Sequence, residues 1–181
     1  MMMAEATNHY FKHLGVSDGL SQVCIPSIYQ DELGAVWLGT TEGLNRYNGK
    51  DVKVFQPSES NHGLTNNEIN ELCGDKNGRM YIRSGNDLIK LDIYTEQFTC
   101  LRQKGVYGLF CKKDTLWVSC ADGIYYYTGQ GTELTFFARV QKGFVGRALY
   151  VDKETVWVVT RKYLVAISRE DPLRQEILLT L

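Results

Sequence analysis

Apolar residues along this chain fall in short runs that are separated by turns rich in glycine, asparagine and aspartate. Three of these runs are apolar at every position: Val36-Trp37-Leu38, Leu116-Trp117-Val118 and Val156-Trp157-Val158-Val159. A strand with two apolar faces must be covered on both sides, as happens when its sheet lies between two neighbouring sheets. The 3.6-residue apolar spacing of an amphipathic helix is absent. The pattern therefore predicts an all-β chain of many short strands.

The clearest unit is residues 25–55, which read IPSIYQDELGAVWLGTTEGLNRYNGKDVKVF. It contains four short strand patterns, with turns at Asp31 to Gly34, at Thr-Glu-Gly and at Asn48-Gly49. Both residues of an Asn-Gly pair tolerate positive φ, so the reversal can match the twist of the flanking strands. The unit predicts a four-stranded antiparallel meander.

The unit recurs along the chain. A shift of 44 residues places Trp37 on Tyr81, and two further copies are centred on Trp117 and Trp157, so the spacings between anchors are 44, 36 and 40 residues. A period of about 40 to 45 residues with four strands per copy is typical of β-propeller blades. We expect the four aromatic anchors to pack between blades rather than to stack on a ligand.

The repeat predicts one propeller domain, divided into a lead at 1–22 and four blades at 23–66, 67–104, 105–143 and 144–181. The lead matches the outer strand of a preceding or closing blade, because Phe11 lies as far before Trp37 as Phe55 does before Tyr81. The fourth copy has its own outer strand at 176–181. An outer strand at both ends predicts an open arc, or a fragment of a larger propeller, whose exposed faces would favour association.

Charge and composition narrow the class of protein. The 181 residues carry 20 Lys plus Arg against 21 Asp plus Glu, a formal charge of −1, which argues against nucleic-acid binding. No apolar run is long enough to span a membrane, so we expect no membrane contact by this segment. The opening MMMAEATNHY lacks the features of a signal peptide. Either the protein is cytoplasmic or an export signal has been removed.

The sequence offers little catalytic chemistry. The histidines are His9, His13 and His62, and none has the spacing of a metal site. Acids such as Asp31 lie in hairpin turns, where they cap the backbone. We therefore predict no catalytic residue, no metal and no cofactor. The five cysteines form no Cys-x-x-Cys pair, and we expect buried free thiols on strands rather than a redox site.

Binding is the more plausible activity, and the loops between blades indicate where to look. In a propeller these loops gather on one face around the axis. A hydroxyl-rich ligand would suit their amides and charges, although the same residue types are common in solvated turns. Arg83 replaces a glycine inside an apolar strand, and we expect it to pair with an acid. The candidate ligand-binding residues are Asn61, His62, Asn66, Asn67, Lys104, Tyr107 and Arg147.

The unit at 25–55 closely resembles the repeat of the two-component regulator propeller family, and the opening FKHLGVSDGLSQ is similar to the start of the sensor region in hybrid two-component regulators of Bacteroidetes. Later copies depart from the repeat, with Tyr81 in place of the tryptophan and Arg83 in place of a glycine. The resemblance rests on Ile28, Gln30, Asp31, Gly34, Val36, Trp37, Leu38, Gly39, Thr40, Gly43, Leu44, Arg46 and Tyr47.

The resemblance implies a periplasmic sensor with propellers of about seven blades, anchored in the inner membrane outside this segment and followed by a histidine kinase. It implies an oligosaccharide ligand and a homodimer of sensor chains, with no enzymatic activity in this segment. Two alternatives stay open. One is a propeller lyase or hydrolase with an axial active site, and the other is a scaffold propeller that binds only protein.

Overall fold

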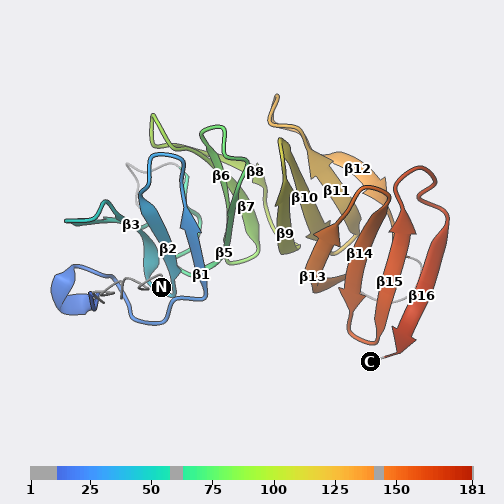
Figure 1. Ribbon diagram of the computed structural model, residues 1–181, viewed down its shortest axis with the longest axis horizontal. Coiled ribbons are helices and arrows are strands. Elements are labelled where there is room, and N and C mark those ends of the chain that lie inside the picture. The colour runs from blue at the N-terminus through green and yellow to red at the C-terminus, as the bar shows by residue number, and fades with distance from the viewer. Residues whose placement is uncertain (1–11, 58–62, 141–144, 181) are drawn as a thin grey trace, which may run out of the picture.

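The structure, a computed structural model, describes residues 12–57, 63–140 and 145–180, with the side chains of residues 145–148 outside the description. This part of the chain consists of β-strands and one short 3-10 helix, η1 (Val16–Asp18). Figure 1 shows the strands gathered into four sheets that stand side by side in chain order. The predicted all-β propeller architecture is confirmed.

Each sheet is a four-stranded antiparallel meander, and we call the four sheets blades 1 to 4. Blade 1 contains β1 (Ser27–Gln30), β2 (Val36–Thr40), β3 (Gly43–Tyr47) and β4 (Val52–Phe55), and blade 2 contains β5 (Ile69–Gly74), β6 (Arg79–Ser84), β7 (Asp87–Asp92) and β8 (Gln97–Arg102). Blade 3 contains β9 (Val106–Lys112), β10 (Thr115–Cys120), β11 (Gly123–Tyr127) and β12 (Thr135–Ala138), and blade 4 contains β13 (Val145–Val151), β14 (Thr155–Thr160), β15 (Tyr163–Ser168) and β16 (Gln175–Thr180).

The first strand of each blade lies next to the first strand of the following blade, from β1 to β5, β9 and β13. These are therefore the inner strands, and the fourth strands form the outer rim. Blade 1 and blade 4 stand at opposite ends of the row, so the blades form an open arc, as expected (Figure 1).

Three hydrophobic clusters fill the spaces between successive blades. The first contains Trp37 and Ile69, the second Tyr81 and Val106, and the third Trp117 with residues of blade 4. Trp37 and Tyr81 are completely buried, whereas Trp157 of blade 4 is half-buried. Removal of these ring surfaces from water is the main force that holds blade to blade.

The glycine after the tryptophan in blade 1 has a packing reason. A Cβ on Gly39 would lie 2.8 Å from the Cγ2 atom of Ile69, so only glycine allows β2 to approach β5 this closely. Arg83 holds the same position in blade 2, and its Nε donates to Glu71 Oε2 at 3.4 Å while a terminal nitrogen donates to the carbonyl of Gly85 at 3.0 Å. The expected acid partner is present.

The structure bears on two further expectations, the outer strand in the lead and the burial of the cysteines. The described part of the lead, residues 12–22, contains η1 and no strand, and Phe11, on which the outer-strand prediction depended, lies outside the described residues. The prediction of buried thiols on strands holds fully for Cys120 alone among the five cysteines, since Cys73, Cys100 and Cys111 are half-buried on strands, and it is wrong for Cys24, which is exposed and precedes β1. Cys24 comes directly before Ile25 and Pro26 in a connecting segment, where no neighbouring blade covers it.

Candidate functional site

The structure describes only some of the residues that were predicted to bind a ligand on the interblade loops. Asn61 and His62 lie outside the described residues, and Arg147 contributes only its backbone, in β13. Asn66 has a structural role. Its side-chain oxygen accepts from the Glu68 backbone amide at 2.9 Å, and its backbone amide donates to the Ser84 hydroxyl at 3.0 Å.

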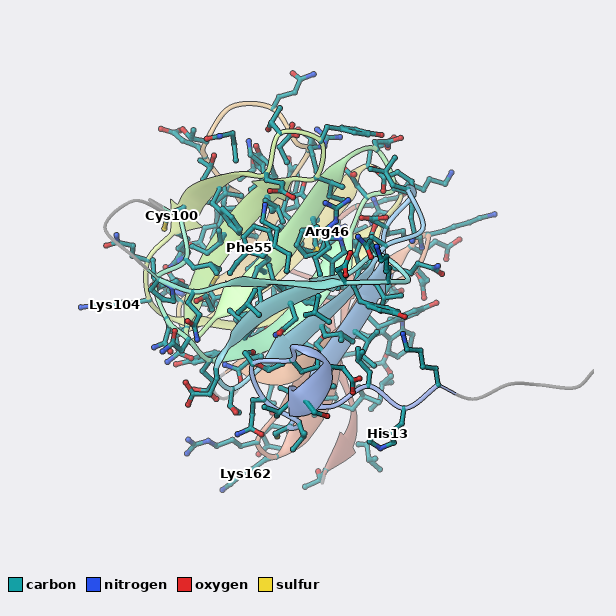
Figure 2. The ribbon with its side chains drawn as sticks, turned by 90° about the vertical axis from the view of Figure 1, so that its left-hand side faces the viewer. His13, Arg46, Phe55, Cys100, Lys104 and Lys162 are labelled. Carbon is teal, nitrogen blue, oxygen red and sulfur yellow. The ribbon has the colours of Figure 1, made fainter. Side chains whose placement is uncertain are left out.

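The remaining candidates belong to two segments, 66–68 and 104–107, that both contact the turn between β6 and β7. Asn67 is exposed, and Tyr107 is half-buried in β9. The Lys104 amide donates to Asp87 Oδ1 at 2.6 Å, and its side chain projects from the edge of the molecule (Figure 2). None of these residues lines the cavity described next, so their role in binding stays a prediction.

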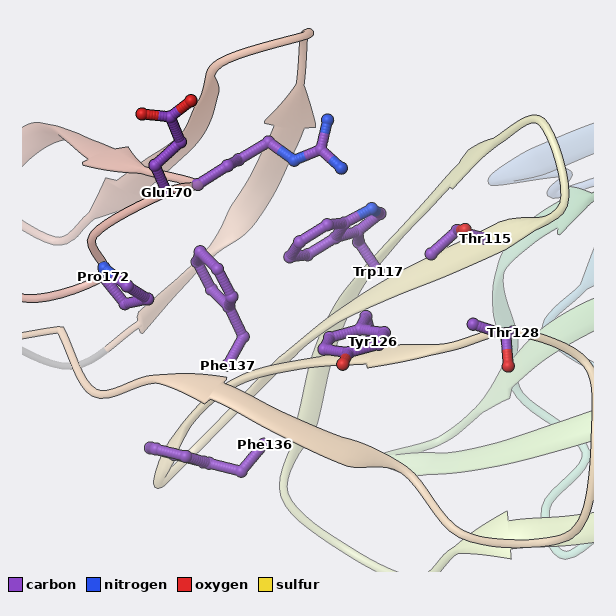
Figure 3. A pocket seen from close by; sticks show the side chains of 9 residues that line it. Thr115, Trp117, Tyr126, Thr128, Phe136, Phe137, Glu170 and Pro172 are labelled. Atoms are coloured by element: carbon purple, nitrogen blue, oxygen red, sulfur yellow. The ribbon is translucent and has the colours of Figure 1, made fainter.

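A cavity of about 450 Å³ lies between blade 3 and the hairpin turn that joins β15 to β16 of blade 4 (Figure 3). Its blade 4 residues belong to the turn between the third and fourth strands, which lies at the ends of the strands opposite to the interblade loops. We call this cavity the blade 3–4 cavity. Its lining consists of Thr115, Trp117, Tyr126, Thr128, Phe136, Phe137, Arg169, Glu170 and Pro172.

Aromatic rings form most of the wall on the blade 3 side. Trp117 packs edge to face on Phe137, with ring centroids 5.0 Å apart and an interplanar angle of 86°, and lies 5.6 Å from Tyr126. Figure 3 shows these three rings grouped around the opening. Rings fixed by one another present rigid apolar surface, which suits the C–H face of a sugar or another flat ligand.

The blade 4 side supplies the charge. The Arg169 guanidinium lies 5.5 Å from the centre of the Trp117 ring, a cation–π arrangement. One of its nitrogens donates to the carbonyls of Asp152 at 3.1 Å and Lys153 at 2.9 Å, so the side chain is held in place. Glu170 adds a carboxylate, and Thr115 and Thr128 add hydroxyls, to a wall that is otherwise aromatic.

The indole N–H of Trp117 distinguishes blade 3 from the two other blades that have a tryptophan anchor. In blades 1 and 4 the turn aspartate accepts from the tryptophan, Asp31 from Trp37 and Asp152 from Trp157, both at 2.7 Å. The corresponding turn of blade 3 is shorter, and its Asp114 instead accepts from Asn77 of blade 2. No described residue accepts from the Trp117 N–H, so a ligand in the blade 3–4 cavity can supply the acceptor.

Sequence reasoning missed Tyr126, Phe137 and Arg169. The sequence did contain one signal for Tyr126. In each blade the aromatic anchor on the second strand has a register partner on the third strand. In register these residues are Arg46, Lys90, Tyr126 and Ala166, so the third blade has an aromatic residue where the first two have a cation. Arg169 could not be found in this way, because it belongs to a turn of the next blade.

Within the described ranges, no cluster of three or more His, Cys, Asp and Glu side chains comes together in the manner of a metal site. The one described helix, η1, has three residues, and no helix there has the length and apolarity to cross a membrane.

Comparison with known proteins agrees with the blade architecture. Residues 19–42, which run from the end of the lead to the turn after β2, match the two component regulator propeller family. Those residues are similar to a two-component regulator propeller repeat. The matched part includes Trp37 and the Gly39 whose packing against blade 2 is described above, so the repeat pattern corresponds to the interblade contact.

Parts of longer proteins are similar to this chain. A histidine kinase P4 of Formosa agariphila is 38% identical over 55 residues, which is 30% of this chain and 4% of the kinase. The extracellular domain of a putative hybrid two component system from B. thetaiotaomicron superimposes with a TM-score of 0.76 and 21% identity, covering 93% of this chain and 26% of that domain. A second such domain from this organism gives 0.64 and 21%, covering 85% and 21%. At these identities the similarity establishes the fold.

Proposed function

We propose that this chain is part of the ligand-sensing, extracytoplasmic region of a hybrid two-component system, and that the blade 3–4 cavity binds an oligosaccharide. The repeat at residues 19–42 and the fold shared with extracellular sensor domains support the first part. The observation that carries the second part is the cavity itself. It combines several fixed aromatic rings with an anchored arginine and an indole N–H that has no described acceptor.

The position of the cavity suggests how binding would produce a signal. Trp117, Tyr126 and Phe137 belong to blade 3, whereas Arg169 and Glu170 belong to blade 4. A ligand that contacts both sets favours one placement of blade 4 relative to blade 3. A ligand shifts an equilibrium only by its difference in affinity for the two arrangements, and a site between two bodies supplies such a difference. In a periplasmic homodimer this shift would pass to the kinase across the inner membrane.

The lining favours binding over hydrolysis. A glycosidase of the usual kind needs two carboxylates that face the same bond, one as acid and the other as base or nucleophile. Glu170 is the single carboxylate among the described residues that line the blade 3–4 cavity. The arrangement therefore provides stacking and hydrogen bonding, and it lacks the second carboxylate of that mechanism.

Isothermal titration calorimetry of the chain against a panel of neutral and acidic oligosaccharides tests the proposal. We expect at least one member to bind, and we expect Phe137→Ala to weaken that binding roughly tenfold because a ring that supports the stacking surface is lost. Tyr94→Ala is the matched control, since Tyr94 is an exposed ring on blade 2 outside the cavity. The proposal fails if no oligosaccharide binds, or if the two variants bind as the unmodified chain does.

A further inference from the structure

Two cysteines from different blades meet at the inner strands. Cys73 lies in β5 of blade 2 and Cys111 in β9 of blade 3, 38 residues apart in sequence. Their Sγ atoms are 2.8 Å apart. Two sulfurs that are not bonded normally stay farther apart than this, and in a disulfide they are about 2.05 Å apart. A small movement of the two side chains therefore suffices for a covalent bond.

The other cysteines have no such neighbour in the described residues. Cys24 is exposed, Cys100 lies half-buried in β8, and Cys120 is buried in β10. The odd cysteine count and the irregular spacing, which argue against a disulfide framework in the sequence, concealed a pair that only the stacking of blade 2 on blade 3 brings together.

We propose that Cys73 and Cys111 form a disulfide that joins the inner strands of blades 2 and 3. The oxidant is the disulfide of another molecule, such as oxidised glutathione or an extracytoplasmic thiol oxidase, which reacts by thiol–disulfide exchange. One cysteine thiolate attacks that disulfide and releases a thiol, which leaves a mixed disulfide. The other cysteine then displaces the second thiol. Two thiol protons and two electrons pass in total to the oxidant, which is reduced to two thiols.

The surroundings affect the rate of this reaction and its consequence. Burial raises the pKa of the Cys73 thiol, and the Cys111 thiol beside it raises that pKa further, so oxidation speeds up as the pH rises. The two strands already contact each other along this stretch. A covalent link at this place fixes blade 2 to blade 3. The inference stands independently of ligand sensing.

Peptide mapping of the native chain tests the proposal without any variant. The purified chain is incubated with oxidised glutathione, free thiols are alkylated, and the digest is analysed by mass spectrometry without reduction. We expect one linked species that contains Cys73 and Cys111, and we expect Cys24, Cys100 and Cys120 in no linked peptide. Recovery of Cys73 and Cys111 alkylated, or each carrying glutathione with no link between them, overturns the proposal.

Thermal unfolding provides a second readout. Oxidation is expected to raise the melting temperature on the order of 5–10 °C, because the closed loop limits the unfolded chain. Cys111→Ser should abolish this dependence on oxidation, whereas Cys100→Ser, the matched control, should retain it. A melting temperature of the unmodified chain that does not respond to glutathione also contradicts the disulfide.

Discussion

The junction between blades 1 and 2 and the junction between blades 3 and 4 solve the same packing problem differently. In the first, Trp37 is completely buried, and the Arg46 guanidinium of the same blade lies 5.5 Å from its ring centre. Arg46 then pairs with Glu96 of blade 2 at 3.0 Å. The Phe55 ring also stacks on the Trp37 ring, with ring centroids 5.7 Å apart. Figure 2 shows Arg46 and Phe55 within this packed region.

In the second junction the cation over the tryptophan comes from the opposite blade. Tyr126 replaces Arg46 in register, and Arg169 of blade 4 lies over Trp117, also at 5.5 Å. Because Arg169 reaches in from a turn rather than from a neighbouring strand, space remains beside it, and the blade 3–4 cavity occupies that space. The same contact, a guanidinium over an indole ring, therefore occurs in a junction that is fully packed and in a junction that keeps a cavity.

The largest expected difference between the junctions is in stability. Trp37→Ala should cost about 3–5 kcal/mol of unfolding free energy, because the ring is fully packed and leaves a cavity. Trp117→Ala should cost less, about 2–3 kcal/mol, since the Trp117 side chain, although buried, borders the blade 3–4 cavity. Urea unfolding of both variants measures the difference. Equal losses would mean that the blade 3–4 junction is as tightly packed as the first.

The next effect concerns the aspartate that binds the tryptophan. Asp31 accepts from the Trp37 indole and from the amides of Leu33 and Ala35. Asp31→Ala leaves these donors unsatisfied and should cost about 1–3 kcal/mol in urea unfolding. Asp114→Ala is the control from blade 3, where the aspartate does not contact the tryptophan, and should cost less than about 0.5 kcal/mol. A similar cost in both would contradict the role given to the indole bond.

The substitutions Glu96→Gln and Arg169→Ala should have different effects, the first on the free energy of unfolding and the second on ligand binding. Glu96→Gln weakens the pairing with Arg46 and Lys53, and we expect a loss of up to about 1 kcal/mol at low salt that shrinks at high salt, because the carboxylate is a quarter exposed. Arg169→Ala should change unfolding little and should weaken oligosaccharide binding in calorimetry. If Arg169→Ala destabilises the chain more than Glu96→Gln, Arg169 acts in packing rather than in a site.

The smallest effect is a dependence on pH in blade 4. The Trp157 indole N–H, followed by the amides of Glu154 and Thr155, lowers the pKa of Asp152. Since the folded pKa lies below the unfolded value of about 3.9, this contribution is present above that pH and is lost as the pH falls through the folded pKa. Asp152→Asn should therefore flatten the loss of stability in that acid range, measured by circular dichroism. An unchanged acid profile would contradict the assignment.

The propeller architecture could be predicted from the sequence because it depends on local signals. Runs with two apolar faces, Asn48-Gly49 and a period close to 40 residues each describe one blade, and blades are stacked in chain order. Even Arg83 could be predicted to need an acid, since an arginine in an apolar strand has few other solutions.

The candidate site could not be predicted in the same way. Trp117 looked like the other anchors, and its difference lies in a turn that is too short to supply an acceptor and in Arg169 from another blade. The Cys73 and Cys111 contact likewise joins two blades. Both features depend on the distance and angle between neighbouring sheets, which a repeat pattern does not specify. The loop amides were chosen by residue type alone, and Asn66 shows that a turn can use such a residue for itself.

The three tryptophan indole N–H signals in a ¹H–¹⁵N correlation spectrum test the central claim most directly. Trp37 and Trp157 already donate to aspartates and serve as internal references, whereas Trp117 faces the blade 3–4 cavity. On titration with the oligosaccharide that calorimetry identifies, we predict that the Trp117 signal shifts with saturation while the other two stay in place. Saturable shifts of Trp37 or Trp157 with an unmoved Trp117 signal would contradict a site between blades 3 and 4.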